Sequence, residues 1–184
     1  MKKNIIAVLL VIALSTAAAF AADASSEFQV QTQVNGKHGL KLVAPGTTTP
    51  TNYGQFNNLS EATPAIFTIN DTNYTTDNLV ARKMVAMSNN RTGYVVTMSA
   101  SAMASALTSG SAYINYVVTA GGATVTTSNA TVVDAAAAVY SSPAELSSLD
   151  IYATDVAITV NESNYEAAVT GTYTGTVTFN LTAN

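Results

Sequence analysis

The sequence predicts an all-β fold built as an antiparallel β-sandwich, and three features lead to this prediction. Short segments rich in Val, Ile, Thr and Tyr alternate apolar and polar residues, which is the pattern of strands with one buried face. Glycine, proline, asparagine and serine separate these segments. Charged residues make up 10% of the chain, whereas roughly 25% is usual, so threonine, which favours extended backbone, fills many polar positions. Strands are expected at 27–34, 38–44, 65–70, 79–88, 93–99, 112–119, 123–133, 151–160 and 172–182.

Residues 1–22 are expected to be a secretory signal peptide. Two lysines precede a short apolar run, Ile5–Leu14, and small residues at Ala19 and Ala21 suit a signal peptidase. Cleavage after Ala21 or Ala22 leaves about 160 residues, enough for one domain with its own core and no further membrane-spanning segment.

The composition of the exported chain restricts its partners. Five basic and eleven acidic residues remain after cleavage, giving a net charge of −6, which argues against nucleic acid and anionic membranes as partners. Because the sequence contains no cysteine, packing, strand hydrogen bonds or assembly have to stabilise it in place of disulfides.

The first strand of the exported chain, FQVQTQV, alternates without interruption. One face carries three glutamines, and the other is suited to burial. The residues of that second face are Phe28, Val30, Thr32 and Val34.

Turns and helices are predicted from local signals. Gly121-Gly122 lies between two alternating segments and predicts a tight hairpin, and Asn35-Gly36 has the same turn chemistry. Short helices are expected over residues 101–110, where Gly110 provides a stop, and over 141–149, where Ser142 precedes a proline.

The last strand, GTYTGTVTFNLT, has one apolar and one Thr-rich face. Its length and apolar face predict a central strand of the core. The apolar face includes Tyr173, Val177, Phe179 and Leu181.

No catalytic or cofactor site is predicted, and the chain is not expected to be an enzyme. His38 is the only histidine, and without a second His or any Cys a zinc site is not expected. Asp71, Asn73 and Asp77 offer oxygen ligands for calcium, but an Asx-rich turn explains the same residues and no metal site is predicted.

Taken together, the chain resembles the subunits of bacterial fimbriae assembled by the chaperone–usher route. The resemblance lies in the signal peptide followed by FQVQTQV, the sandwich-like body, and the ending from Gly171 and Tyr173 to Leu181. It implies an immunoglobulin-like β-sandwich in residues 37–184 and a donor-type strand in residues 23–36. In that family the donor strand of one subunit fills the groove of the next. The groove strand here would contain Tyr173, Val177, Phe179 and Leu181.

The resemblance further implies a homopolymer exported through the periplasm to the bacterial surface, where it serves adhesion. A periplasmic chaperone and an outer-membrane usher are its implied assembly partners. The alternative is a self-contained secreted sandwich, a binding or adhesion module for ligands such as carbohydrates. In that alternative, residues 28–34 turn at Asn35-Gly36 and pair within their own chain.

Overall fold

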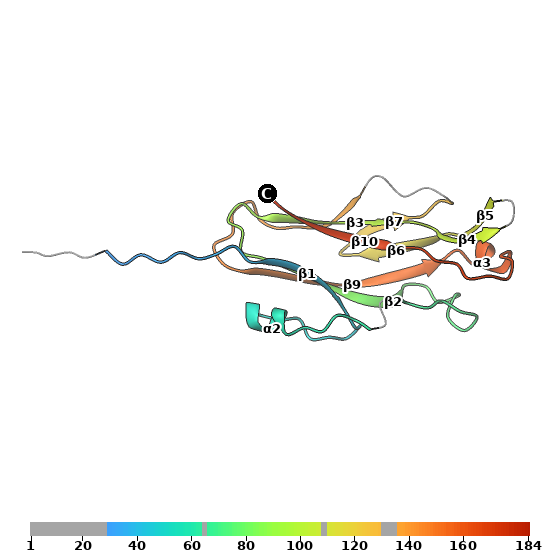
Figure 1. Cartoon of the computed structure of the whole chain (residues 1–184), viewed down its shortest axis with the longest axis horizontal. Coiled ribbons are helices and arrows are strands. Elements are labelled where there is room, and N and C mark those ends of the chain that lie inside the picture. Colours follow the sequence, from blue (N-terminus) through green and yellow to red (C-terminus); the bar gives the residue numbers. More distant parts are fainter. Residues whose placement is uncertain (1–28, 64–65, 108–109, 130–135) are drawn as a thin grey trace, which may run out of the picture. The chain divides into compact units, whose positions relative to one another are not determined.

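The computed structural model describes residues 29–184, except 64–65, 108–109 and 130–135, and the chain divides after Val34. Residues 35–184 form one compact unit made mainly of antiparallel strands (Figure 1). Residues 29–34 form neither helix nor strand. The expected signal peptide and Phe28 lie outside the described residues.

The all-β prediction is confirmed. The strands are β1 (His38–Val43), β2 (Leu79–Ser88), β3 (Tyr94–Ala100), β4 (Met103–Leu107), β5 (Gly110–Ile114), β6 (Tyr116–Ala120), β7 (Ala123–Thr126), β8 (Ala137–Ser141), β9 (Asp150–Val160) and β10 (Val177–Ala183). Two short helices, α2 (Tyr53–Asn57) and α3 (Glu162–Glu166), each begin after an asparagine cap. Within the described ranges, no helix has the length and apolar character needed to cross a bilayer.

The strands form two main sheets and one hairpin. The larger sheet has the order β1-β2-β9-β6-β7, the smaller sheet has the order β10-β3-β8, and β4 pairs with β5. Every strand pairing is antiparallel. The main core draws on both sheets, so they enclose it as the two layers of a sandwich. Its buried residues are Met84, Ala86, Tyr94, Val96, Met98, Ala100, Tyr116, Val118, Ala120, Val125, Val139 and Val156.

A second cluster covers the opposite face of the larger sheet. Val43, Val85 and Met87 are buried there together with Phe56 of α2. Lys41 donates hydrogen bonds to the carbonyl oxygens of residues 57 and 59, at 2.9 and 2.8 Å, and holds the chain after α2 against β1. Strand β2 is therefore buried on both faces, which explains its nearly continuous burial.

The Gly121-Gly122 hairpin is confirmed. The two glycines have φ values of 56° and 81°, and β6 and β7 pair directly on either side of them. A side chain at Gly121 would also collide with the Tyr152 hydroxyl, since an added Cβ would lie 2.4 Å from it.

Several local predictions were wrong. Of residues 101–110, Met103–Leu107 form β4 and Gly110 begins β5, because this alanine-rich segment pairs antiparallel with β5 and so is extended and not helical. Residues 141–149 form no helix, residues 66–70 form no strand, and the segment 112–119 is divided between β5 and β6. Strand β8 was missed.

The predicted Asn35-Gly36 turn is also absent. Residues 35–37 carry no turn, and Gly36 does not have a positive φ. The segment instead bonds to Asn89 at the end of β2. Tertiary hydrogen bonds therefore override the turn preference of the Asn-Gly pair.

A polar cluster joins the two sheets at one end of the core. The hydroxyl groups of Tyr94 and Tyr140, in the smaller sheet, both donate to Asp150 Oδ2 of β9 at 2.9 Å. Tyr140 also stacks on Tyr152 with ring centroids 4.0 Å apart. Burial and the hydrogen bond to Asp150 raise the pKa of Tyr140 to about 12 and raise the pKa of Tyr94 further.

We expect the free energy of unfolding to fall as the pH rises from 10 toward 12. In the unfolded chain these tyrosines ionise near pH 10, whereas folding keeps them protonated to higher pH, so the unfolded state binds fewer protons in this window. Denaturant titrations at several pH values measure the effect. The Tyr94→Phe variant should lose roughly 1.5–3 kcal/mol at neutral pH and show a shallower decline above pH 10; an unchanged slope would contradict this assignment.

Candidate functional site

Two strand edges on the same side of the sandwich have no partner strand among the described residues. In that part of the chain, β10 pairs with β3 alone and β1 pairs with β2 alone. Although β1 and β10 belong to different sheets, their Cα atoms approach within 8 Å.

The prediction that the last strand is central was wrong, because alternation reports one buried face and not the position of a strand within its sheet.

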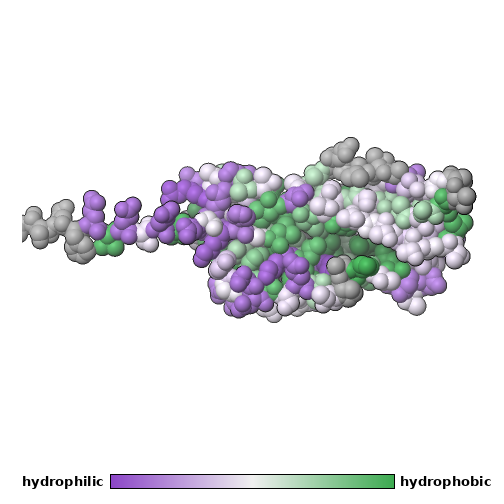
Figure 2. All heavy atoms as spheres, in the orientation of Figure 1, coloured by the Kyte–Doolittle hydropathy of each residue, from purple (hydrophilic) through white to green (hydrophobic). Residues whose placement is uncertain are grey.

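Half-buried apolar side chains lie along these two edges. In β10 they alternate with exposed Thr178, Asn180 and Thr182. Figure 2 shows hydrophobic residues gathered in a band along the middle of the visible face, over β1 and β10. These half-buried side chains, all packed against the main core, form a strip that we name the acceptor groove; they are Leu40, Leu42, Val177, Phe179 and Leu181.

The backbone of β10 leaves hydrogen-bonding groups at the open edge. The carbonyl oxygen of Thr176 accepts from Ser101 N at 2.9 Å, and Asn184 N donates to the Gly93 carbonyl at 3.0 Å. In an antiparallel ladder every second residue bonds to the same neighbour. The even-numbered residues of β10 therefore bond to β3, and the backbone groups of Val177, Phe179 and Leu181 face the free edge.

Strand β1, on the opposite side of the acceptor groove, offers fewer unpaired backbone groups. Asn89 N donates to the Lys37 carbonyl at 3.0 Å, so the odd-numbered residues of β1 bond to β2 and the even-numbered ones face outward. The Leu42 carbonyl is already used, because it accepts from Ala62 N at 2.9 Å. His38 and Leu40 are left to offer backbone groups on this side.

The structure brings together only part of the predicted groove strand. Val177, Phe179 and Leu181 share the half-buried face of β10, whereas Tyr173 precedes the strand and donates its hydroxyl to the Val169 carbonyl at 3.0 Å. Sequence reasoning missed Leu40 and Leu42, although the alternation in HGLKLV carries the same signal as the last strand.

The predicted donor residues Val30, Thr32 and Val34 lie in no strand of the single chain. Their side chains are exposed, Val30 to 84% and Val34 to 75%. Isolated apolar residues with such exposure are common on protein surfaces, but Val30 and Val34 are four residues apart and would share one face if the segment became a strand.

In the loop considered for calcium, oxygen atoms of the candidate ligands Asp71 and Asn73 already accept hydrogen bonds from within the protein. Asp71 Oδ1 accepts from the Tyr165 hydroxyl at 2.8 Å, and Asn73 Oδ1 accepts from Asn70 N at 2.8 Å. Asn70 Oδ1 in turn accepts from Thr72 N at 2.9 Å, which is an Asx turn. Across the described ranges, no three His, Cys, Asp or Glu side chains gather as metal ligands would.

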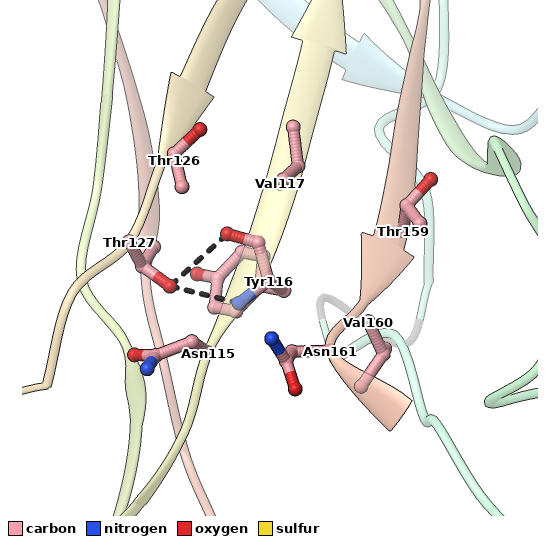
Figure 3. A pocket seen from close by; sticks show the side chains of 8 residues that line it. All are labelled: Asn115, Tyr116, Val117, Thr126, Thr127, Thr159, Val160 and Asn161. Atoms are coloured by element: carbon pink, nitrogen blue, oxygen red, sulfur yellow. Dashed lines mark hydrogen bonds between the residues drawn. The ribbon is translucent and has the colours of Figure 1, made fainter. Parts of the chain in front are cut away.

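A pocket of about 290 Å³ lies beside the start of β6 and the ends of β7 and β9 (Figure 3). Its best-placed hydroxyl is already used, because Thr127 Oγ1 accepts from Tyr116 N at 2.9 Å and donates to the Tyr116 carbonyl at 3.0 Å. The lining contains amides, hydroxyls and apolar groups but no charged side chain, so it offers neither an acid–base pair nor an ion site. The lining residues are Asn115, Tyr116, Val117, Thr126, Thr127, Thr159, Val160 and Asn161.

Several tyrosines have structural roles. Tyr94 and Tyr116 are buried in the main core, and Tyr152 stacks on Tyr140. A stacked pair that the sequence did not indicate, Tyr74 and Tyr165, joins the loop after residue 70 to α3, with ring centroids 4.3 Å apart.

Comparisons of the chain with models of protein families, with curated proteins and with solved structures gave no match.

Backbone amide exchange tests the free edge of β10. In the single chain, we expect the amides of Val177, Phe179 and Leu181 to exchange readily, because they face the open edge. The amides of Thr178, Asn180 and Thr182 should be protected by β3 and serve as matched controls within the same strand. Hydrogen exchange followed by NMR measures both sets, and equal protection of the two sets would contradict the open edge.

Proposed function

We propose that this chain is the structural subunit of a filament on the bacterial surface, and that the N-terminal segment of one copy fills the acceptor groove of the next. The observation that carries the proposal is the apolar groove between two free strand edges. Unpaired edges beside exposed core residues are a liability in a soluble protein, and an added strand removes both the unpaired backbone groups and the exposed apolar area.

The strand order supports an immunoglobulin-type interpretation. In that fold one sheet has the order A-B-E-D and the other the order C-F-G. With β1, β2, β3, β6, β9 and β10 taken as strands A to F, the larger sheet contains A-B-E-D and the smaller one contains C beside F. Strand G belongs at the free edge of β10, and no described residue of this chain lies there as a strand.

The donor segment matches this vacant place in length and pattern. Residues 28–34 and β10 are both seven residues long, which is about 23 Å of strand. With the apolar face of the donor turned to the core, Phe28, Val30 and Val34 would each contribute roughly 1.5–3 kcal/mol on burial. Each backbone hydrogen bond with the open edge would add about 1 kcal/mol.

Donation between copies leads to a fibre. The donor segment and the acceptor groove are different surfaces of the same chain, so the contact is head-to-tail and leaves a free donor and a free groove at the two ends. A low charge content, a Thr-rich surface and the absence of cysteine suit a repeating extracellular assembly that is stabilised by strand pairing. Surface adhesion is the role we infer for the assembled filament.

Substitution of a donor residue tests the proposal. We expect Val30→Asp to abolish polymer, because a carboxylate would enter an apolar groove without a partner. The single chain should keep the Tm of the wild-type single chain, since Val30 is 84% exposed there. Size on an unboiled denaturing gel, compared with the boiled sample, reports the polymer.

Gln31→Asp is the matched control. It introduces the same charge one residue away, on the polar face of the donor, and should polymerise as the wild type does. Normal fibres from Val30→Asp would contradict the proposal, as would equal loss of polymer in both variants.

A further inference from the structure

Residues 35–37, between the donor segment and β1, form hydrogen bonds with Asn89. Asn89 Oδ1 accepts from Lys37 N at 2.5 Å, and Asn89 Nδ2 donates to the Asn35 carbonyl at 3.1 Å. The backbone of Asn89 adds a third bond, to the Lys37 carbonyl at 3.0 Å. The Asn89 clasp, as we name these three bonds, continues the pairing of β1 with β2 beyond His38 and Ser88.

The Asn89 clasp keeps residues 35–37 out of a reverse turn. Gly36 lacks a positive φ, although a two-residue Asn-Gly hairpin turn requires positive φ at both positions. The Lys37 ammonium lies 4.2 Å from the centre of the Tyr53 ring, and this cation–π contact favours the same arrangement.

The contacts of Asn89 and Lys37 affect which acceptor groove the donor segment can fill. To fill the groove of its own chain beside β1, the donor would have to reverse direction within residues 35–37, and the bonds of the clasp would break. To fill the groove of a second copy, the segment needs no turn, and all of these contacts remain. Filling its own groove therefore costs the chain the contacts that Asn89 and Lys37 make, whereas filling the groove of a second copy keeps them.

We propose that Asn89 is a positioning residue that selects donation to a second copy over insertion into the chain's own groove. The inference rests on the proposed function, and it adds that the chain carries a built-in device against self-completion. Removing the side chain of Asn89 frees the Asn-Gly pair to adopt the turn that its sequence favours.

The test compares refolded wild type with Asn89→Ala. We expect the ratio of closed monomer to polymer to rise roughly thirtyfold, which corresponds to the loss of two side-chain hydrogen bonds. Size-exclusion chromatography separates monomer from polymer. A synthetic peptide of residues 27–35 then distinguishes the monomers, because an open groove binds the peptide and a self-filled groove does not.

Two further variants show whether the effect is specific. Asn57→Ala removes an exposed asparagine from the body and should behave as the wild type does. Gly36→Val, where an added Cβ meets nothing within 4 Å, opposes the turn. Combined with Asn89→Ala, it should restore polymer, whereas mere misfolding of Asn89→Ala would not be rescued.

The outcomes separate the two proposals. If the wild type polymerises and Asn89→Ala gives the same ratio of monomer to polymer, Asn89 has no selecting role and only this inference fails. If the wild type gives no polymer and its monomer does not bind the peptide, the proposed function fails as well.

Discussion

The structure depends on how the sandwich core is closed along its two long sides. On one side, β7 of the larger sheet and β8 of the smaller sheet come within 8 Å of each other, and Val125 and Val139 of these two strands are buried in the main core. On the other side, β1 and β10 have no strand between them in the part of the chain that is described, and Phe179 remains half-buried. Because no disulfide can compensate, the added strand that we propose would bury this side, and assembly would then be part of the stability of the fold.

The corner between β2 and β3, residues 89–93, bonds to the chain next to both strands that border this open side, β1 and β10. Asn89 bonds to residues 35–37 at the entrance to β1, while Asn90 Nδ2 donates to the Asn184 carbonyl at 2.9 Å at the far end of β10. Thr92 bonds to the same carbonyl oxygen. The inter-sheet cluster of Tyr94, Tyr140 and Asp150 lies just beyond this corner. These bonds tie the two edges to the same corner, which would lower the ordering cost of the strand addition that we propose.

Much of the fold could be predicted from local patterns, and the errors share one physical cause. Strand β2 has the predicted bounds, and the Gly121-Gly122 hairpin follows from glycines that accept positive φ. Hydrogen-bonding partners outside the segment decided the rest: β5 pairs with residues 103–107 and makes them a strand, and Asn89 keeps Asn35-Gly36 from turning. The β10 residues of the acceptor groove could be predicted from the alternation of apolar and polar residues in that strand. The contribution of β1 could not, because only the sheet order reveals that β1 and β10 border the same open side.

The most direct test of the central claim is a disulfide formed between two different copies. The sequence contains no cysteine, so Gln31→Cys in one population and Thr178→Cys, Asn180→Cys or Thr182→Cys in another introduce the only thiols. With the apolar donor face turned to the core, Gln31 and one of these three residues lie on the same outer face of neighbouring strands, close enough for a disulfide. The account predicts a mixed disulfide with one of the three partners, identified by mass spectrometry of polymer assembled from both populations. Polymer that forms normally and yields no mixed disulfide with any of them would contradict the account.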